Sequence, residues 1–247
     1  MTKITLLIPC FNEGGRILKV LEKMTAIPEI DQIICIDDGS TDTTAQKITE
    51  NYDIEVLRLP QNVGKSAAVR LGLASTENEW VFLCDADLCQ INIKEFRIAC
   101  QHIKNDMADM IILRRMKAPW FVKFDRGDIL FSGERILKTN DLKAVLKKEV
   151  ENYQLEIAIN QWMLDRNKKV YWLPSSVVNT YKFQKLGLVK GLIKEFGMWY
   201  NLIQYVGVKN YVYQISKFAT KTFNSSKYSL QTKKTVSKDM VMQKLGL

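Results

Sequence analysis

WVFLCDAD, residues 80–87, is an apolar run that ends abruptly in two carboxylates. A continuous apolar run of this length, rich in Val, Phe and Leu, is typical of a parallel strand that is covered on both faces. Asp85 and Asp87 follow the run directly and stand two positions apart. In an open α/β sheet, ligands bind outside the carboxyl ends of the strands. We therefore expect a ligand site where this strand ends.

Similar apolar runs lie on both sides of this stretch and alternate with segments of helical periodicity. The predicted strands are 4–10, 32–38, 54–59, 80–84, 110–113 and 170–173. The predicted helices are 15–25, 43–51, 65–74, 93–104, 141–149 and 155–165. This alternation predicts an α/β fold with a mostly parallel central sheet and helices on both faces. Residues 114–128 show no clear period and predict a loop or a short irregular element that crosses the carboxyl edge of that sheet.

Carboxylates gather at the ends of three predicted strands. Glu13 follows the first strand, Asp37 and Asp38 end the second, and Asp85 and Asp87 follow the fourth. Five carboxylates near one sheet edge would repel one another unless a cation offsets their charge. Hard oxygen ligands suit Mg²⁺ or Mn²⁺, which could also offset the charge on a leaving nucleoside diphosphate. The other interpretation of Asp85 and Asp87 is a solvated acidic turn.

Two further motifs limit the chemistry. Gly64-Lys65-Ser66 is not a P-loop, because Leu59 stands where that motif needs a glycine. Lys65 either offers its positive charge to a phosphate bound at the start of a helix or is simply exposed. His102 is the only histidine, and its helical pattern predicts a surface or hydrogen-bonded side chain. A hydrolase with a Ser-His-Asp or Cys-His pair is therefore disfavoured.

Composition and charge divide the chain unevenly. Its 247 residues are 47% hydrophobic and 26% charged, which is typical of a folded globular protein. Residues 182–247 hold 12 Lys, no Arg and two acids, a net charge of +10, and the overall charge of +9 leaves −1 for residues 1–181. Five cysteines without a regular framework predict reduced thiols in a cytoplasmic compartment. We expect neither a signal peptide nor a membrane-spanning helix.

The basic region contains an amphipathic stretch, LGLVKGLIKEFGMWYNLIQYVGVKNYVY, residues 186–213. Its apolar side chains recur at helical spacing and lysines border them. Such a helix either lies in the interface of an anionic membrane or packs on the α/β domain. Nucleic acid is disfavoured as a partner, because this region has no arginine and no recognised binding motif. We therefore expect a domain at 1–181, a basic amphipathic helical segment at 182–224 and a flexible basic tail at 225–247.

Four segments together resemble the family 2 glycosyltransferases of GT-A fold. They are LIPCFNE (7–13), IDDGSTD (36–42), NVGKSAA (62–68) and DADL (85–88), in the order and spacing of that family. The resemblance covers about residues 1–175. It is greatest to the dolichyl- or polyprenyl-phosphate sugar synthases and related lipid-linked glycosyltransferases. It implies a GT-A fold, a nucleotide-sugar donor and a bound Mg²⁺ or Mn²⁺.

The resemblance also implies roles for single residues. Those that would seat the nucleoside are Pro9, Phe11, Glu13 and Asp38, the last of them at the base. Those that would act at the diphosphate are Lys65 and the two metal ligands Asp85 and Asp87. The sequence departs from the lipid-phosphate synthases after the second Asp. Cys89 stands at a usual Gln position, and no histidine follows His102, so a third protein ligand for the metal is not matched.

On the acceptor side the resemblance is to SGERIL (132–137), which implies that Arg135 engages the acceptor, with Arg126 as a second candidate. Glu156 lies where many relatives carry an acid that faces the acceptor. If the acceptor is a hydroxyl, Glu156 could be the general base; an ionised phosphate acceptor needs none. The other interpretation of Glu156 is a charge on a helix surface.

We therefore expect a metal-dependent, inverting glycosyltransferase. It would move a sugar from a UDP- or GDP-sugar to a lipid-linked acceptor, a polyprenyl phosphate or a glycolipid, at the cytoplasmic face of the membrane. The alternatives are a soluble or cell-surface glycan acceptor and a non-catalytic protein that binds sugar nucleotides. A sugar nucleotidyltransferase would have a Gly-rich loop with Arg and Lys after the first strand, which PCFNEGG (9–15) does not supply.

Overall fold

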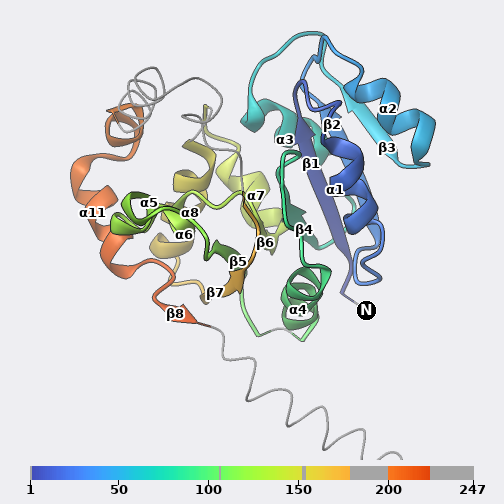
Figure 1. Cartoon of the computed structure of the whole chain (residues 1–247). Helices are drawn as coiled ribbons and strands as arrows, with labels where there is room; N and C mark the ends of the chain where they lie inside the picture. The colour runs from blue at the N-terminus through green and yellow to red at the C-terminus, as the bar shows by residue number, and fades with distance from the viewer. Residues whose placement is uncertain (1, 106, 152–153, 179–199, 223–247) are drawn as a thin grey trace, which may run out of the picture.

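Eight strands form one mixed sheet in the computed structural model, which describes residues 2–105, 107–151, 154–178 and 200–222 (Figure 1). The strands are β1 (Ile4–Cys10), β2 (Gln32–Asp37), β3 (Glu55–Arg58), β4 (Trp80–Leu83), β5 (Met110–Arg115), β6 (Arg135–Lys138), β7 (Val170–Ser175) and β8 (Lys221–Thr222). Their order across the sheet is β3-β2-β1-β4-β6-β5-β7-β8. All six strands expected from the sequence are present, and the parallel pairing of β1 with β2 and β4 confirms the predicted sheet type.

The sequence prediction missed β6. This strand pairs antiparallel with both β4 and β5 and lies between them. Its four residues, Arg135 to Lys138, begin and end with a cation and contain only two apolar residues, so no apolar run marked it. Because β6 is antiparallel to both neighbours, β4 and β5 run in the same direction and their carboxyl ends share one edge of the sheet.

Nine helices with defined bounds lie in the described residues, and residues 200–206 are also helical. They are α1 (Ile17–Met24), α2 (Thr44–Asn51), α3 (Lys65–Ala74), α4 (Ile93–Lys104), α5 (Trp120–Phe124), α6 (Gly127–Leu130), α7 (Thr139–Val145), α8 (Gln154–Asp165) and α11 (Val208–Lys217). Residues 114–128, where a loop or a short irregular element is predicted, contain the end of β5, the helix α5 and the start of α6. Helices of four or five residues are too short to show a helical period.

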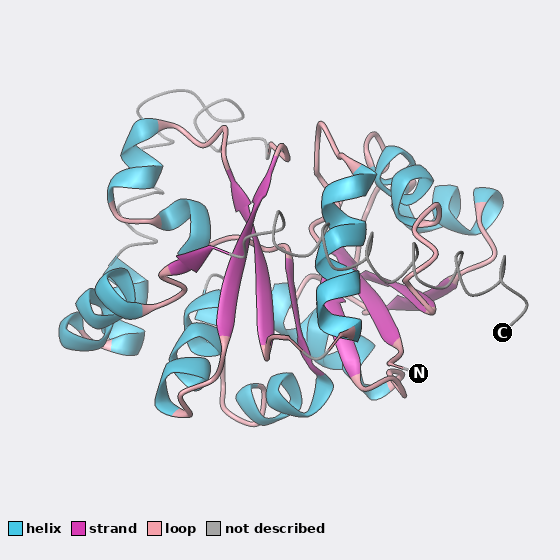
Figure 2. Ribbon diagram, turned by 90° about the horizontal axis from the view of Figure 1, so that it is seen from below, coloured by secondary structure: helices cyan, strands magenta, loops and turns pink. Residues whose placement is uncertain are grey.

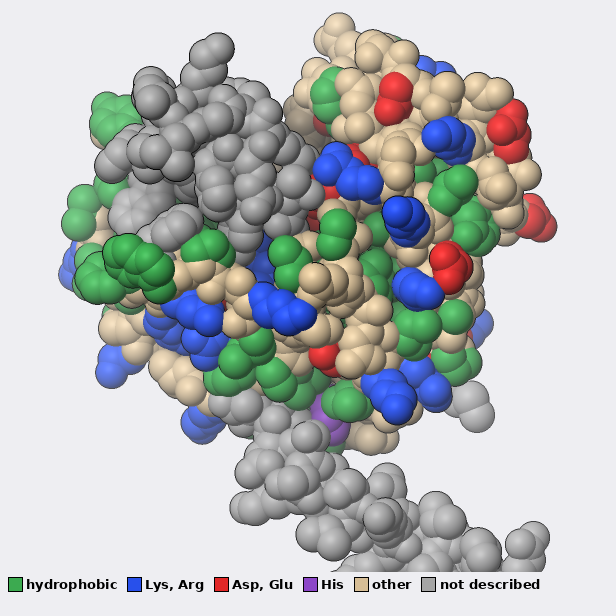
Figure 3. Space-filling view, in the orientation of Figure 1, with side chains coloured by type: hydrophobic (Ala, Val, Ile, Leu, Met, Phe, Trp, Pro, Cys, Tyr) green, Lys and Arg blue, Asp and Glu red, His purple; other side chains and the backbone are tan. Residues whose placement is uncertain are grey.

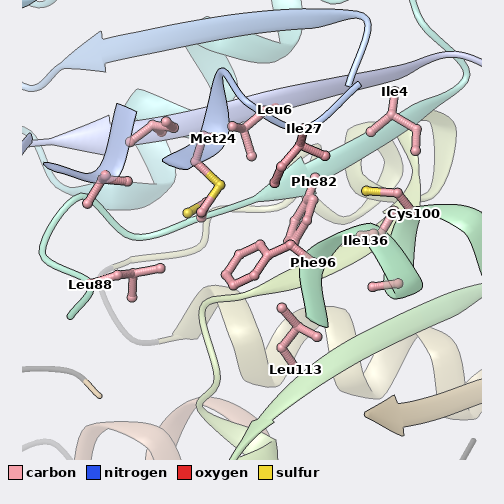
Figure 4. Close-up of a cluster of buried hydrophobic side chains, with 14 of the residues drawn as sticks. Ile4, Leu6, Met24, Ile27, Phe82, Leu88, Phe96, Cys100, Leu113 and Ile136 are labelled. Atoms are coloured by element: carbon pink, nitrogen blue, oxygen red, sulfur yellow. The ribbon is translucent and has the colours of Figure 1, made fainter. Parts of the chain in front are cut away.

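The helices cover both faces of the sheet, as predicted (Figure 2). Alternate apolar side chains of β1 to β7 divide between the two faces. One core cluster joins the sheet to α1, α2 and α4, and Figure 4 shows its centre, where the rings of Phe82 and Phe96 stack with centroids 5.5 Å apart. The other cluster joins the opposite face to α3, α6, α7, α8 and α11. Side chains buried on both faces explain the continuous apolar runs of the strands.

The basic C-terminal region is described only between residues 200 and 222; the rest of 182–224 and all of 225–247 lie outside the described residues. In the described part, α11 packs on α8 with one face, where Tyr211 and Gln214 are buried and Gln214 Nε2 donates to the carbonyl of Ile157 at 3.3 Å. No helix in the described ranges combines the length and the hydropathy that a bilayer crossing requires.

Candidate active site at the carboxyl edge of the sheet

The carboxyl ends of β1, β2 and β4 meet at one edge because these strands are neighbours and parallel. Cys10 pairs with Asp37 across β1 and β2, and Leu7 pairs with Leu83 across β1 and β4. The segments that follow the strands therefore begin side by side (Figure 1). This register brings the predicted acidic strand ends together at one edge, as the sequence implied.

Arginines already neutralise two of the five carboxylates. Glu13 Oε2 lies 2.6 Å from Nε of Arg16, the residue that directly precedes α1. Asp37 is fully buried, and its Oδ2 lies 3.2 Å from Arg58 Nε while Oδ1 accepts from the amide of Ser40 at 2.9 Å. The expectation that a metal ion relieves the repulsion among all five carboxylates is therefore corrected for these two. Arginines and a backbone amide do so instead.

Asp38 organises the loop that leads into α3. Its two carboxylate oxygens accept from the amides of Val63 and Gly64, both at 2.9 Å, and from Asn62 Nδ2 at 3.1 Å. Gly39, which follows it, has φ +71°, and a Cβ there would lie 2.4 Å from the carbonyl carbon of Gln61. The Asp38-Gly39 corner thus holds the loop 61–64 closely and sets the position at which α3 begins.

Lys65 joins two predicted site residues that are distant in sequence. Its Nζ lies 2.6 Å from Asp85 Oδ1, after β4, and 2.8 Å from Glu156 Oε1, in the first turn of α8. Burial alone would lower the pKa of Lys65, but the two carboxylates outweigh it and raise the pKa well above its ordinary value. Lys65 is therefore a fixed cation between Asp85 and Glu156, and the alternative of a simply exposed lysine is excluded. Glu156 is buried, so it is not a helix-surface charge.

The segment before β6 packs directly on Asp85. A Cβ at Gly133 would lie 2.4 Å from Asp85 Oδ2, so only glycine leaves room for the carboxylate. The next residue, Glu134, is fully buried and accepts from Ser132 Oγ at 3.1 Å. Burial raises the pKa of Glu134 above its ordinary value, and the negative charge of Asp85 is the second cause of this increase. Sequence reasoning assigned no role to Glu134, although the family resemblance pointed to the segment SGERIL (132–137) that contains it.

Arg135 does not face the open edge of the sheet. It is fully buried, and its guanidinium donates to the carbonyls of Ser132 and Glu156 and to Asn160 Oδ1, at 2.9 Å for the last. Burial lowers the pKa of Arg135 to about 10. Contact with an acceptor would require these bonds to break, so the geometry favours a positioning role for Arg135. The second candidate, Arg126, donates to carbonyls near the end of α11.

The donor set at β4 fits a hard divalent cation with only two protein ligands. Asp85 and Asp87 follow the strand end, each partly exposed. In residues 2–105, 107–151, 154–178 and 200–222, no three His, Cys, Asp or Glu side chains gather in a group that could hold a metal. Mg²⁺ is commonly bound by one or two carboxylates together with substrate phosphates. Asp85 and Asp87 therefore suit an ion whose coordination a diphosphate completes.

Comparison with known proteins gives a family and several similar proteins. Residues 5–167 match the model of "Glycosyl transferase family 2". The chain is 39% identical over 88 residues to the poly-beta-1,6-N-acetyl-D-glucosamine synthase of Staphylococcus aureus, covering 34% of this chain and 21% of that protein. It is 36% identical over 97 residues to a dolichyl-phosphate beta-glucosyltransferase of Trichomonas vaginalis, covering 34% of this chain and 28% of that protein. The chain thus spans about a quarter of the length of these curated relatives.

A solved structure resembles the fold over most of the chain. It is glucosyl-3-phosphoglycerate synthase from Mycobacterium tuberculosis, in complex with Mn²⁺ and uridine-diphosphate-glucose. The TM-score is 0.66 at 16% identity, covering 83% of this chain and 78% of that one.

Proposed function

The chain belongs to glycosyl transferase family 2 and has the GT-A fold, and on this premise we propose that it transfers a sugar from a nucleotide sugar to an acceptor with inversion. The observation that carries the proposal is the group formed by Asp85, Lys65 and Glu156 at the carboxyl edge of the sheet. It places carboxylates and a fixed cation where an α/β sheet binds its ligands.

The donor would lie across the ends of β1, β2 and β4. Pro9, Phe11 and Glu13 would line the nucleoside pocket, and Phe11 is 41% exposed at this edge. Asp38 would face the base while it holds the loop 61–64 in place. The diphosphate would then reach the start of α3, where backbone amides and Lys65 offer positive charge. The donor would be a UDP- or a GDP-sugar.

Asp85 and Asp87 would hold Mg²⁺ or Mn²⁺ together with the diphosphate of the donor. The bound ion would stabilise the negative charge that builds on the leaving nucleoside diphosphate. Mn²⁺ is present in the complex of the mycobacterial synthase named above. Lys65 would keep Asp85 oriented, and Gly133 would leave space for its carboxylate.

The acceptor would approach from the side of α8 and the segment 131–134. Glu156 would take the proton of a hydroxyl acceptor as general base, with Lys65 fixing its carboxylate 2.8 Å away. An acceptor phosphate would need no base. We propose a lipid-linked acceptor at the cytoplasmic membrane face, because one similar protein is named for a dolichyl phosphate. Another is named for a polymeric glycan, which supports the alternative of a glycan acceptor. In this proposal residues 1–181 form the catalytic domain and 182–224 attach to the membrane.

Calorimetric titration with UDP and with GDP, each with Mn²⁺ and with a chelator, tests the donor site. We expect one nucleotide to bind in the presence of Mn²⁺ and to bind at least about tenfold more weakly with chelator, or after Asp87→Asn. Asp53→Asn is the matched control, because Asp53 is exposed before β3 at the opposite edge of the sheet. Binding of neither nucleotide, or binding indifferent to both the metal and Asp87, would overturn the proposal. Binding without release of nucleoside diphosphate on addition of any acceptor would favour the non-catalytic alternative.

A further inference from the structure

Exposed apolar side chains are concentrated in two segments of the protein. Nine large hydrophobic residues are exposed in the described part of the chain, and seven of them lie in residues 116–124 and 200–213. Trp120 and Phe124, at the two ends of α5, are 80% and 85% exposed. Burial of such side chains is normally favourable, so a cluster of them indicates a surface that meets another body.

The two segments lie side by side in the fold. Arg126, just after α5, donates to the carbonyls of Ile215 and Ala219 at 2.8 and 2.9 Å. Tyr211 Oη lies 3.2 Å from Asp125 Oδ2. These bonds hold α5 against α11, and Figure 1 shows the two helices next to each other. We call the exposed sides of α5 and α11, with the residues that flank them from 114 to 124 and from 200 to 222, the α5–α11 face.

This face carries positive charge and no exposed acid. In residues 114–124, Lys117 and Lys123 are exposed and no residue is Asp or Glu, while Arg115 is buried and Arg114 pairs with Asp128. Residues 200–222 contain three exposed Lys and no Asp or Glu. The adjoining acids, Asp125 and Asp128, are buried against Tyr211 and Arg114. In Figure 3, hydrophobic and basic side chains gather over the left of the molecule, where Figure 1 places α5 and α11. The chemistry of the face is therefore aromatic and cationic at once.

We propose that the α5–α11 face docks on the surface of an anionic lipid bilayer. Exposed Trp, Phe and Tyr favour the headgroup boundary of a bilayer, and Lys and Arg are attracted to anionic lipids. A second copy of the chain fits the same face poorly, because a two-fold contact would set its lysines against those of its partner. This inference deepens the proposed function and rests on it for the lipid-linked acceptor.

Docking through this face would also orient the proposed active site. α5 directly follows β5, whose carboxyl end shares an edge with that of β4. The chain then returns through α6 to Gly133, which packs on Asp85. The segment between β5 and β6 has fewer than twenty residues. It contains both α5, which would face the bilayer, and Gly133, which packs on Asp85. A lipid headgroup could meet the donor edge without leaving the membrane surface.

The experiment measures co-sedimentation of the full chain with vesicles of phosphatidylcholine alone and of phosphatidylcholine mixed with phosphatidylglycerol. We expect binding to the anionic vesicles only, weakened by high salt. Trp120→Ser with Phe124→Ser, and Lys123→Glu with Lys209→Glu, should each weaken it about tenfold or more. Matched controls are Val63→Ser and Lys19→Glu, which change an exposed apolar residue and an exposed lysine elsewhere. All variants should keep the wild-type melting temperature.

The outcomes separate this inference from the proposed function. If both double variants bind anionic vesicles like the wild type, the α5–α11 face is not the docking site. If the wild type binds no vesicles but binds nucleotide with Mn²⁺, the membrane inference fails while the donor site stands. If the wild type self-associates and Trp120→Ser with Phe124→Ser abolishes it, the occupant is a second copy and the inference is overturned.

Discussion

Gly133 illustrates how one position without a side chain can control a functional group elsewhere in the chain. Its missing Cβ leaves the space in which the Asp85 carboxylate lies, and Lys65 Nζ lies 2.6 Å from Oδ1 of that carboxylate. Asp85 is therefore held between a glycine and a lysine from different elements. A carboxylate fixed in this way is oriented before any ligand arrives, which lowers the cost of binding a cation.

Gly133→Ala should displace Asp85, because the new Cβ would lie 2.4 Å from Oδ2. We expect nucleotide affinity in the presence of Mn²⁺ to fall about tenfold or more, while affinity with chelator changes little. Calorimetric titration measures both. Gly15→Ala is the control, because no atom lies within 4 Å of a Cβ there. Equal affinities in the two variants would show that Asp85 is not held as described.

β6 is the element on which the second half of the site depends. It inserts antiparallel between β4 and β5, and it carries Arg135 into the interior. The guanidinium there bonds to the carbonyls of Ser132 and Glu156 and to Asn160, so it ties the segment 132–134 to α8. Buried acceptors left without a donor are costly, which makes this guanidinium a structural link between the Asp85 side and the Glu156 side.

Arg135→Met should lower the free energy of unfolding by about 2–4 kcal/mol, because several buried carbonyls lose their donor. Arg135→Lys should have a free energy of unfolding between those of the wild type and Arg135→Met, because one ammonium group cannot reach all of the acceptors. Urea unfolding followed by circular dichroism measures the loss. Arg70→Met is the control, because Arg70 also donates to carbonyls but at the surface, and it should cost about 1 kcal/mol or less. A fully stable Arg135→Met that had lost only acceptor affinity would restore the role expected from the sequence.

At the scale of the whole molecule, stability near neutral pH includes a contribution from the single histidine. His102 lies in the last turn of α4, where the helix end favours the protonated form, yet burial outweighs this and lowers the pKa of His102. The unfolded chain therefore takes up this proton at a higher pH than the folded protein does. The contribution of His102 to the free energy of unfolding is fully present above about pH 6.5 and is lost as the pH falls below this value.

His102→Gln should therefore flatten the decline of stability with falling pH between about 7.5 and 5.5. Glu134 acts in the opposite direction, because a raised carboxyl pKa favours the folded state at lower pH. The measured quantity is therefore the difference in free energy of unfolding between wild type and His102→Gln, obtained from urea unfolding across the pH range. Parallel curves for the two proteins would mean that His102 does not contribute.

Local features could be predicted from the amino-acid sequence: the strands and helices with long periodic runs, the parallel sheet, and the acidic strand ends at one edge. These follow from the burial of successive residues along one element, which leaves a pattern in the sequence. Which charged side chains meet depends on the three-dimensional packing. Lys65 lies 20 residues from Asp85 and 91 from Glu156, and it joins them only because α3, β4 and α8 converge. It likewise buried Arg135, inserted the short strand β6, and set α5 beside α11. Such contacts depend on how elements distant in sequence pack together, and no local sequence pattern indicates this packing.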